Sequence, residues 1–343
     1  MWQRQRGGDS SALLQAKNIN IGVGVEDVEY ISRRMAIEVL SAHSREAFQL
    51  MSERVDDFAR AYLDQLLADH PEAIQNIRDP GVQAAILDAE SAYARSGDDD
   101  LGSLLVDILT KRTTSPKRNL TQLALSESIN VAQKLTSEQY SSLSLVFLLR
   151  NVRFGINSLD GLHARLVDTF SPVFADAAVT GADAQHLIAT GCAILLPVNR
   201  TLPGLMADNY PGLFAAGIDH DNPVITQVPG GFLRPSLRDP TKLQVDSVDR
   251  DSLRTKMTEE GIPPETQEIL NNLLTHHTMN EDALREELID IAPSMRPVTQ
   301  KWDDSLFSQL SLTSVGIVLA HSNISRLTAG SFSTPLEIFL SPE

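Results

Sequence analysis

The sequence predicts a mainly α fold, a helical bundle with an N-terminal β-strand segment and a loop-rich mixed middle region. Apolar residues recur at helical spacing over most of the chain, a short stretch near the N-terminus alternates with period two, and prolines concentrate in the middle. These observations divide the chain into an N-terminal polar tail and strand (1–25), a helical bundle (26–174), a mixed segment (175–245) and a C-terminal helical region (246–343).

The composition is that of a folded protein and disfavours two classes of partner. The chain has 343 residues, 42% of them hydrophobic, and a formal net charge of −16. That length allows about two domains of roughly 150 residues each. The negative charge disfavours nucleic acid and anionic lipid surfaces. No apolar run approaches the roughly 18–20 residues that cross a bilayer, so no membrane association is expected.

Cys192 is the only cysteine, which excludes an internal disulfide and a multi-cysteine zinc site. No apolar segment follows the arginines near the N-terminus, so we find no secretion signal there. The expected compartment is the cytoplasm. Because Cys192 is followed by the apolar run Ala193–Leu196, we interpret it as a buried structural thiol.

The period-two stretch predicts a strand over residues 13–25. Apolar side chains occupy one face from Ile19 onward, while asparagine and glycine occupy the other. No turn and second strand follow, so its backbone groups need a distant strand of the same chain or a neighbouring subunit. The residues predicted to mediate oligomerisation are Leu13, Ile19, Ile21, Val23 and Val25.

A long helical tract follows, from about residue 26 to residue 69, with no proline before Pro71. One helix, or two with a kink near His43, would fit. It could pack along a partner or fold into an antiparallel pair within one bundle, and the spacing leaves both open. Its apolar residues step by three or four, the spacing of a helix-packing seam: Phe48, Met51, Val55, Phe58, Tyr62 and Leu66.

Further elements are predicted from local patterns. Asp79-Pro80-Gly81 and Gly97 separate helices, and Thr136 to Gln139 has the spacing of a capping box. In the middle, residues 192–197 and 224–228 are candidate short strands. After residue 246 we expect four helices and a terminal strand-like piece, within 247–260, 264–277, 280–291, 293–307 and 336–340.

The sequence contains no complete motif for catalysis or cofactor binding. Gly22-Val-Gly24 lies at the end of the predicted strand, but Asp27 stands where a dinucleotide fold needs a small residue. The sequence has no P-loop and no nucleophile elbow. Gly8-Asp9-Ser10-Ser11 precedes any scaffold that could hold a nucleophile. We therefore assign no catalytic, cofactor-binding or metal-binding residue.

Two alternatives stay open. The first is a hydrolase or nuclease whose site is assembled from dispersed residues of the middle region, with Asp219, His220, Asp221 and Cys192 as candidates. The adjacent His276 and His277 diverge on a helix and are poor joint ligands. The second is a ligand-sensing regulatory subunit that binds a small molecule in the middle region.

Several short motifs resemble those of known groups of bacterial proteins. Gly7-Gly8-Asp9-Ser10-Ser11, Gln15-Ala16 and Asn18-Ile19-Asn20-Ile21 resemble the N-terminal signature of uncharacterised bacterial cytoplasmic helical proteins. That resemblance implies a helical fold and no particular active site. Residues 98–109 and 312–316 are similar to helical proteins of the abortive-infection type, which implies a role in bacterial antiphage defence.

The leading hypothesis from the sequence is a non-catalytic, homo-oligomeric interaction protein whose main partner is itself. It depends on a strand without a local partner and on a long helix that carries an apolar seam.

Overall fold

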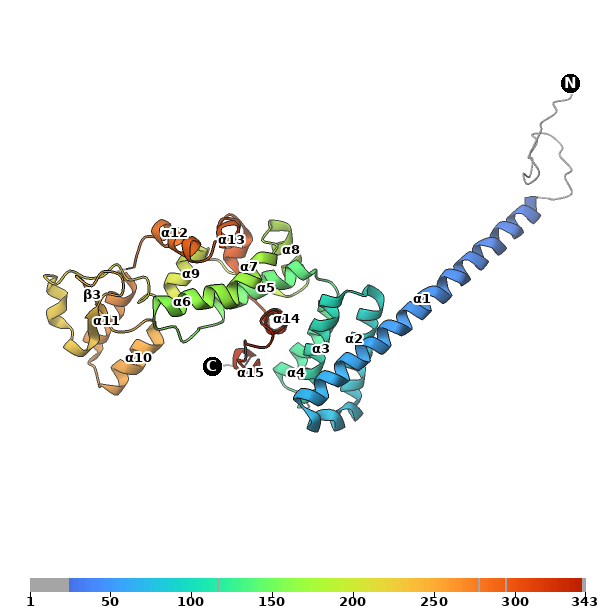
Figure 1. Ribbon diagram of the computed structural model, residues 1–343, viewed down its shortest axis with the longest axis horizontal. Helices are drawn as coiled ribbons and strands as arrows, with labels where there is room; N and C mark the ends of the chain where they lie inside the picture. Colours follow the sequence, from blue (N-terminus) through green and yellow to red (C-terminus); the bar gives the residue numbers. More distant parts are fainter. Residues whose placement is uncertain (1–24, 116, 277, 294, 341–343) are drawn as a thin grey trace, which may run out of the picture. The chain divides into compact units, whose positions relative to one another are not determined.

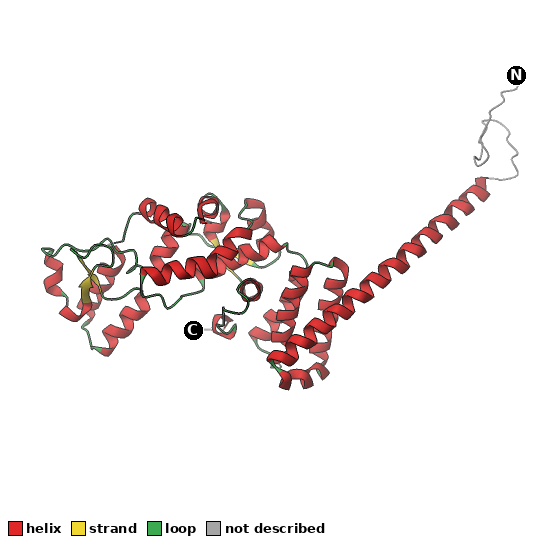
Figure 2. Ribbon diagram, viewed as in Figure 1, coloured by secondary structure: helices red, strands yellow, loops and turns green. Residues whose placement is uncertain are grey.

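The computed structural model describes residues 25–115, 117–276, 278–293 and 295–340, without the side chains of residues 25–43, 174 and 276. The predicted mainly α class is confirmed, with a few three-residue strands among the helices (Figure 2). The chain divides into two compact units, residues 1–57 and 58–343. In the first unit, the described residues belong to α1 (Val25–Asp69), whose last turns lie in the second. Every helix of the described residues is too short or too polar to cross a bilayer.

The first part of the second unit is a helical bundle, and the helix boundaries predicted at residues 79–81, 97 and 136–139 are found in it. The Asp79 carboxylate accepts hydrogen bonds from the backbone N–H of Gly81 and Val82, and Gly97 ends the next helix with a φ of 62°. Thr136 and Gln139 form the predicted capping box. The bundle comprises η1 (Pro71–Arg78), α2 (Pro80–Ser96), α3 (Asp99–Thr114), α4 (Leu120–Ala132) and α5 (Ser137–Arg150).

Helix α5 and helix α14 (Ser314–Leu327) form the centre of the main hydrophobic core (Figure 1). Residues 139–149 of α5 are buried on every side. Their serines are satisfied within the core: Ser144 Oγ donates to the Tyr140 and Ala320 carbonyls and accepts from Asn323 Nδ2. A helix that buries its full circumference needs such internal partners for its polar groups.

Short elements pack around this centre. β1 (Ala193–Leu195) pairs antiparallel with β4 (Leu310–Leu312), more than 100 residues away in sequence, with Ile194 opposite Ser311. The other elements here are α6 (Leu159–Arg165), a π-helical turn (Leu166–Phe170), α7 (Ser171–Asp176), α8 (Gly181–Ala189), α9 (Leu202–Asn209), α12 (Glu281–Ile291), α13 (Met295–Asp303), η5 (Leu306–Gln309) and α15 (Glu337–Leu340).

Residues 217–275 form what we call the small lobe, which has a hydrophobic core of its own. An isolated β-bridge between Ala215 and Thr278 joins the two chain segments at its base. A side chain at Gly212 would clash with the Ser247 carbonyl, its Cβ lying 2.0 Å away, so only glycine permits this close backbone approach. The lobe contains η3 (Pro223–Gln227), η4 (Gly230–Phe232), β2 (Leu233–Pro235), β3 (Leu243–Val245), α10 (Arg250–Glu259) and α11 (Pro264–His276). β2 and β3 pair antiparallel.

Several strand predictions need correction. Residues 224–228 lie in η3 rather than in a strand, because Asn222 caps the N–H of Val224 and Pro223 opens a helical turn. Residues 337–340 form the short helix α15, in which Leu340 is buried, and Leu336 directly before it is buried as well. β1 lies within the predicted 192–197 strand, but Ile194 and Leu195 are about half exposed rather than buried.

Candidate functional site

The seam of α1 is buried in its C-terminal half. Phe58, Tyr62 and Leu66 are 2%, 3% and 0% exposed. The Tyr62 hydroxyl lies 2.8 Å from Thr113 Oγ1, and the Phe58 ring packs 5.7 Å from the ring of Tyr93. Burial raises the pKa of Tyr62 and keeps its hydroxyl neutral. This half of the seam therefore fixes the end of α1 within the bundle.

The N-terminal half of the same seam is exposed. Phe48 is 74% exposed and Met51 is 41% exposed, while Val55 is half-buried. Because these residues continue the three- and four-residue steps, they lie on the helix face that Phe58 occupies further along. We call Phe48, Met51 and Val55 the exposed seam. A large aromatic side chain left in solvent on such a face is typical of an interaction surface.

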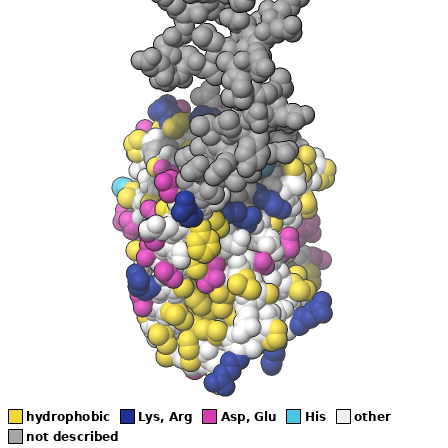
Figure 3. Space-filling model, turned by 90° about the vertical axis from the view of Figure 1, so that its right-hand side faces the viewer, with side chains coloured by type: hydrophobic (Ala, Val, Ile, Leu, Met, Phe, Trp, Pro, Cys, Tyr) yellow, Lys and Arg dark blue, Asp and Glu magenta, His cyan; other side chains and the backbone are white. Residues whose placement is uncertain are grey.

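Other exposed apolar side chains lie on the bundle helices. Figure 3 shows a group of apolar side chains on the face that it presents, with both basic and acidic side chains around it. Leu87 of α2 is 65% exposed, and Leu120 and Leu123 of α4 are about half exposed. Single exposed leucines are common on protein surfaces. The exposed seam differs from them because its residues follow the packing period of one helix.

The long-helix prediction is confirmed as one continuous helix, and the antiparallel-pair alternative is wrong. α1 runs without interruption from Val25 to Asp69, since no glycine or proline breaks it after Gly24. The predicted strand residues Leu13, Ile19, Ile21 and Val23 lie outside the described residues. Val25, where that strand was expected to end, is instead the first residue of α1.

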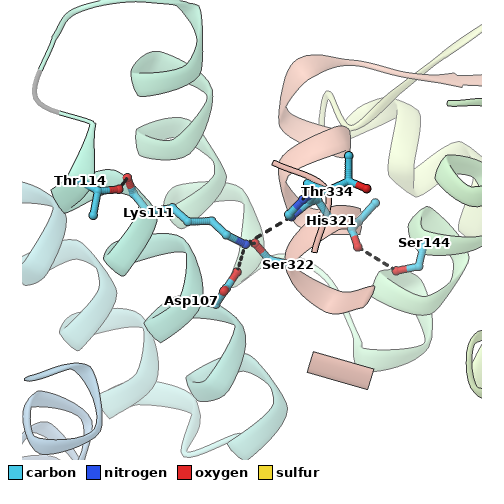
Figure 4. A network of polar contacts seen from close by, with 8 residues as sticks. Asp107, Lys111, Thr114, Ser144, His321, Ser322 and Thr334 are labelled. Carbon is cyan, nitrogen blue, oxygen red and sulfur yellow. Dashed lines mark hydrogen bonds and ion pairs between the residues drawn. The ribbon is translucent and has the colours of Figure 1, made fainter. Parts of the chain in front are cut away.

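A buried polar cluster joins α3 to α14 (Figure 4). Lys111 Nζ lies 2.5 Å from Asp107 Oδ2, 3.3 Å from His321 Nδ1 and 3.3 Å from Ser322 Oγ. His321 Nε2 lies 2.8 Å from the carbonyl of Thr334, in the segment that follows α14. His321 is 4% exposed and Ser322 is 0% exposed.

Burial, followed by the charge of Lys111, lowers the pKa of His321 to about 4, so its imidazole is neutral near pH 7. In the tautomer that fits both contacts, the Nε2–H group donates to Thr334 and Nδ1 accepts from the Lys111 ammonium. A serine beside a lysine is a known nucleophile–base pairing. Ser322 is sealed from solvent, however, and the Lys111 charge is paired with Asp107. The role of the cluster is therefore to hold α3 and α14 together.

The sequence reasoning missed this cluster. Lys111 stands with Arg112 in a basic pair that suggests solvent exposure, and His321 directly follows the apolar run 315–320. A lone histidine next to a core segment could have indicated a buried polar contact. Its partner could not have been found, because Lys111 is 210 residues away in sequence.

The candidate residues for a dispersed enzyme site are not brought together. Cys192 belongs to the main core, where burial raises the pKa of its thiol. Asp219, His220 and Asp221 are exposed next to Ile218 of the small-lobe core, and Asp219 pairs with Lys242 at 3.4 Å. Within the described residues, no group of three metal-ligating side chains converges. His277 lies outside them.

Comparison with known protein families gives one match. A family model with the description ":-like" matches residues 22–340. The chain belongs to this family. The description names no activity or ligand. No curated protein and no solved structure matches the chain.

Proposed function

We propose that the protein is a non-catalytic, homo-oligomeric assembly protein whose copies associate through the exposed seam of α1. The observation that carries this proposal is the exposure of Phe48 and Met51 on the helix face that buries Phe58 further along. A helix of 45 residues is far longer than the usual three to four turns, and most helical stability comes from packing an apolar face.

A second copy of the chain is the partner that supplies a matching surface. Two identical helices can pair about a twofold axis, so that the same apolar patch is buried on both sides. Steps of three and four residues suit packing between helices that cross at a shallow angle. The pairing would bury Phe48 and Met51 of both copies at once.

The N-terminal strand enters the proposal as a second contact. Residues Leu13, Ile19, Ile21 and Val23 alternate with polar residues and would pair between copies next to the start of α1. We place the assembly in the cytoplasm, where a free thiol such as that of Cys192 persists. A role in antiphage defence belongs to the proposal through the resemblance to abortive-infection proteins.

The oligomeric state of the full-length chain tests the proposal directly. Sedimentation velocity over a wide range of concentration should show a species heavier than the 37.6 kDa of one copy, with dissociation on dilution. A single species of monomer mass at every concentration would contradict the proposal.

A further inference from the structure

A cleft opens where the small lobe meets the rest of the second unit. Its volume is about 480 Å³, within the roughly 300–1,000 Å³ typical of small-molecule sites, which often lie between domains. One wall is the start of α10 in the lobe. The other comes from the segment after α5 and from α9. The lining residues are Arg153, Phe154, Gly155, Arg200, Asp208, Asn209, Asp249, Arg250, Asp251 and Ser252.

Hydrogen bonds hold the walls of this cleft in place. The N–H of Phe154 donates to the Tyr210 hydroxyl at 2.9 Å, and Asn209 Nδ2 donates to the Leu149 carbonyl at 2.9 Å. On the lobe side, the N–H of Gly212 donates to the Val248 carbonyl at 3.0 Å. The cleft is thus formed by anchored backbone, as a preorganised binding site requires.

Each acidic side chain of the lining already has a partner. Asp208 pairs with Arg200 at 3.1 Å, and Asp251 pairs with Arg254 at 2.8 Å. The Asp249 carboxylate accepts the N–H of Ser252 at 2.7 Å as the cap of α10. These contacts reduce the repulsion that an incoming anion would meet.

Two arginines of the lining have no carboxylate partner among the described residues. Arg153 Nη1 donates only to backbone carbonyls, those of Arg150 at 3.4 Å and Val152 at 3.1 Å. Arg250 is exposed at the first position of α10 and forms no ion pair within the described chain. Burial lowers the pKa of Arg153, while the carboxylates of Asp251, Asp208 and Asp249, which are not in direct contact with it, act in the opposite direction.

We propose that this cleft binds a small anionic ligand that carries phosphate or carboxylate groups, held between the guanidinium groups of Arg153 and Arg250. A guanidinium group presents a planar fork of donors that matches both kinds of group in a bidentate manner. The half-buried Phe154 ring, which has the Arg165 guanidinium 5.0 Å from its centre, also lines the cleft and would offer the rest of its apolar surface to an organic part of the ligand. This inference concerns ligand binding, and it stands whether or not the copies associate through α1.

Titration calorimetry on the full-length protein tests the proposal, with pyrophosphate and citrate as probes at matched ionic strength. Saturable binding of pyrophosphate alone would identify a phosphate site, and binding of citrate alone a carboxylate site. Arg153→Gln and Arg250→Gln should each raise the dissociation constant by at least about tenfold, the equivalent of about 1.4 kcal/mol.

Arg234→Gln is the matched control, because Arg234 lies in β2 of the same lobe, is 42% exposed and pairs with Asp246, and neither residue lines the cleft. It should change the dissociation constant little. Arg250→Gln decides the test if Arg153→Gln does not fold, since Arg250 is exposed and its replacement should leave the fold intact. The proposal is overturned if neither probe binds, or if Arg250→Gln binds as tightly as Arg234→Gln.

Discussion

Placing two acidic residues on the exposed seam should dissociate the assembly. The variant carries Phe48→Glu and Met51→Glu, which exchange the apolar face of α1 for charges. Glutamate is a good helix former, so the helix itself should persist. The full-length chain with both changes is expected to sediment as a monomer at concentrations where the unchanged chain is associated.

The exposed fractions set the magnitude of this effect. Phe48 and Met51 leave 74% and 41% of their surface in solvent, and full burial of such a side chain contributes roughly 1.5–3 kcal/mol. Each copy therefore has about 2–3 kcal/mol available, and a symmetric pair about 4–7 kcal/mol before association costs. Loss of about 4 kcal/mol alone weakens the dissociation constant by roughly a thousandfold.

Leu50→Glu provides the control for the seam variant. Leu50 is 47% exposed on the same helix, but it lies two residues from Phe48 and one from Met51, about 200° and 100° away around the helix axis. It adds the same kind of charge at the same level of α1. Sedimentation velocity should find Leu50→Glu associated and the double variant monomeric. Equal masses for the two variants would refute the seam as the contact.

Three further predictions follow from the same structure. A chain that starts at Val25 should associate more weakly than the full-length chain in mass photometry; unchanged association would remove residues 1–24 from the mechanism. The pKa of His321 is about 4 in the folded state and about 6.5 in the unfolded state. Between pH 4 and pH 6.5 the imidazole is therefore protonated in the unfolded chain and neutral in the folded one. Stability should therefore be fully present above about pH 6.5 and fall, by at most about 1.4 kcal/mol per pH unit, as the pH drops towards 4. Urea unfolding of the full-length chain and of His321→Gln measures this, and an identical pH slope for both would contradict the assignment. If the protein acts in antiphage defence, expression of the full-length chain in bacteria should lower phage plaque counts, and expression of the Phe48→Glu, Met51→Glu variant should not. Equal protection by both chains would show that defence does not depend on association through the exposed seam.

The sequence by itself determined the features that depend on near neighbours. The helix boundaries at Asp79 and Gly97 and the capping box at Thr136 lie where the patterns predict, because such boundaries depend on hydrogen bonds between residues a few positions apart. The continuity of α1 likewise depends only on the absence of helix breakers over its length. Of the two segments that were predicted as strands and are helical, residues 224–228 and 336–340, the first also has a local cause, the Asn222-Pro223 helix start.

The tertiary structure decided which of these surfaces are covered. The spacing of the α1 seam is uniform, yet Phe58 is buried and Phe48 is exposed, because burial depends on which distant helices pack against each turn. The pairing of Lys111 with His321 and the cleft beside Arg153 likewise arise from segments far apart in sequence. Hydrogen-bonded turns are set by a few consecutive residues, whereas burial and electrostatic environment are set by long-range contacts that periodicity does not encode.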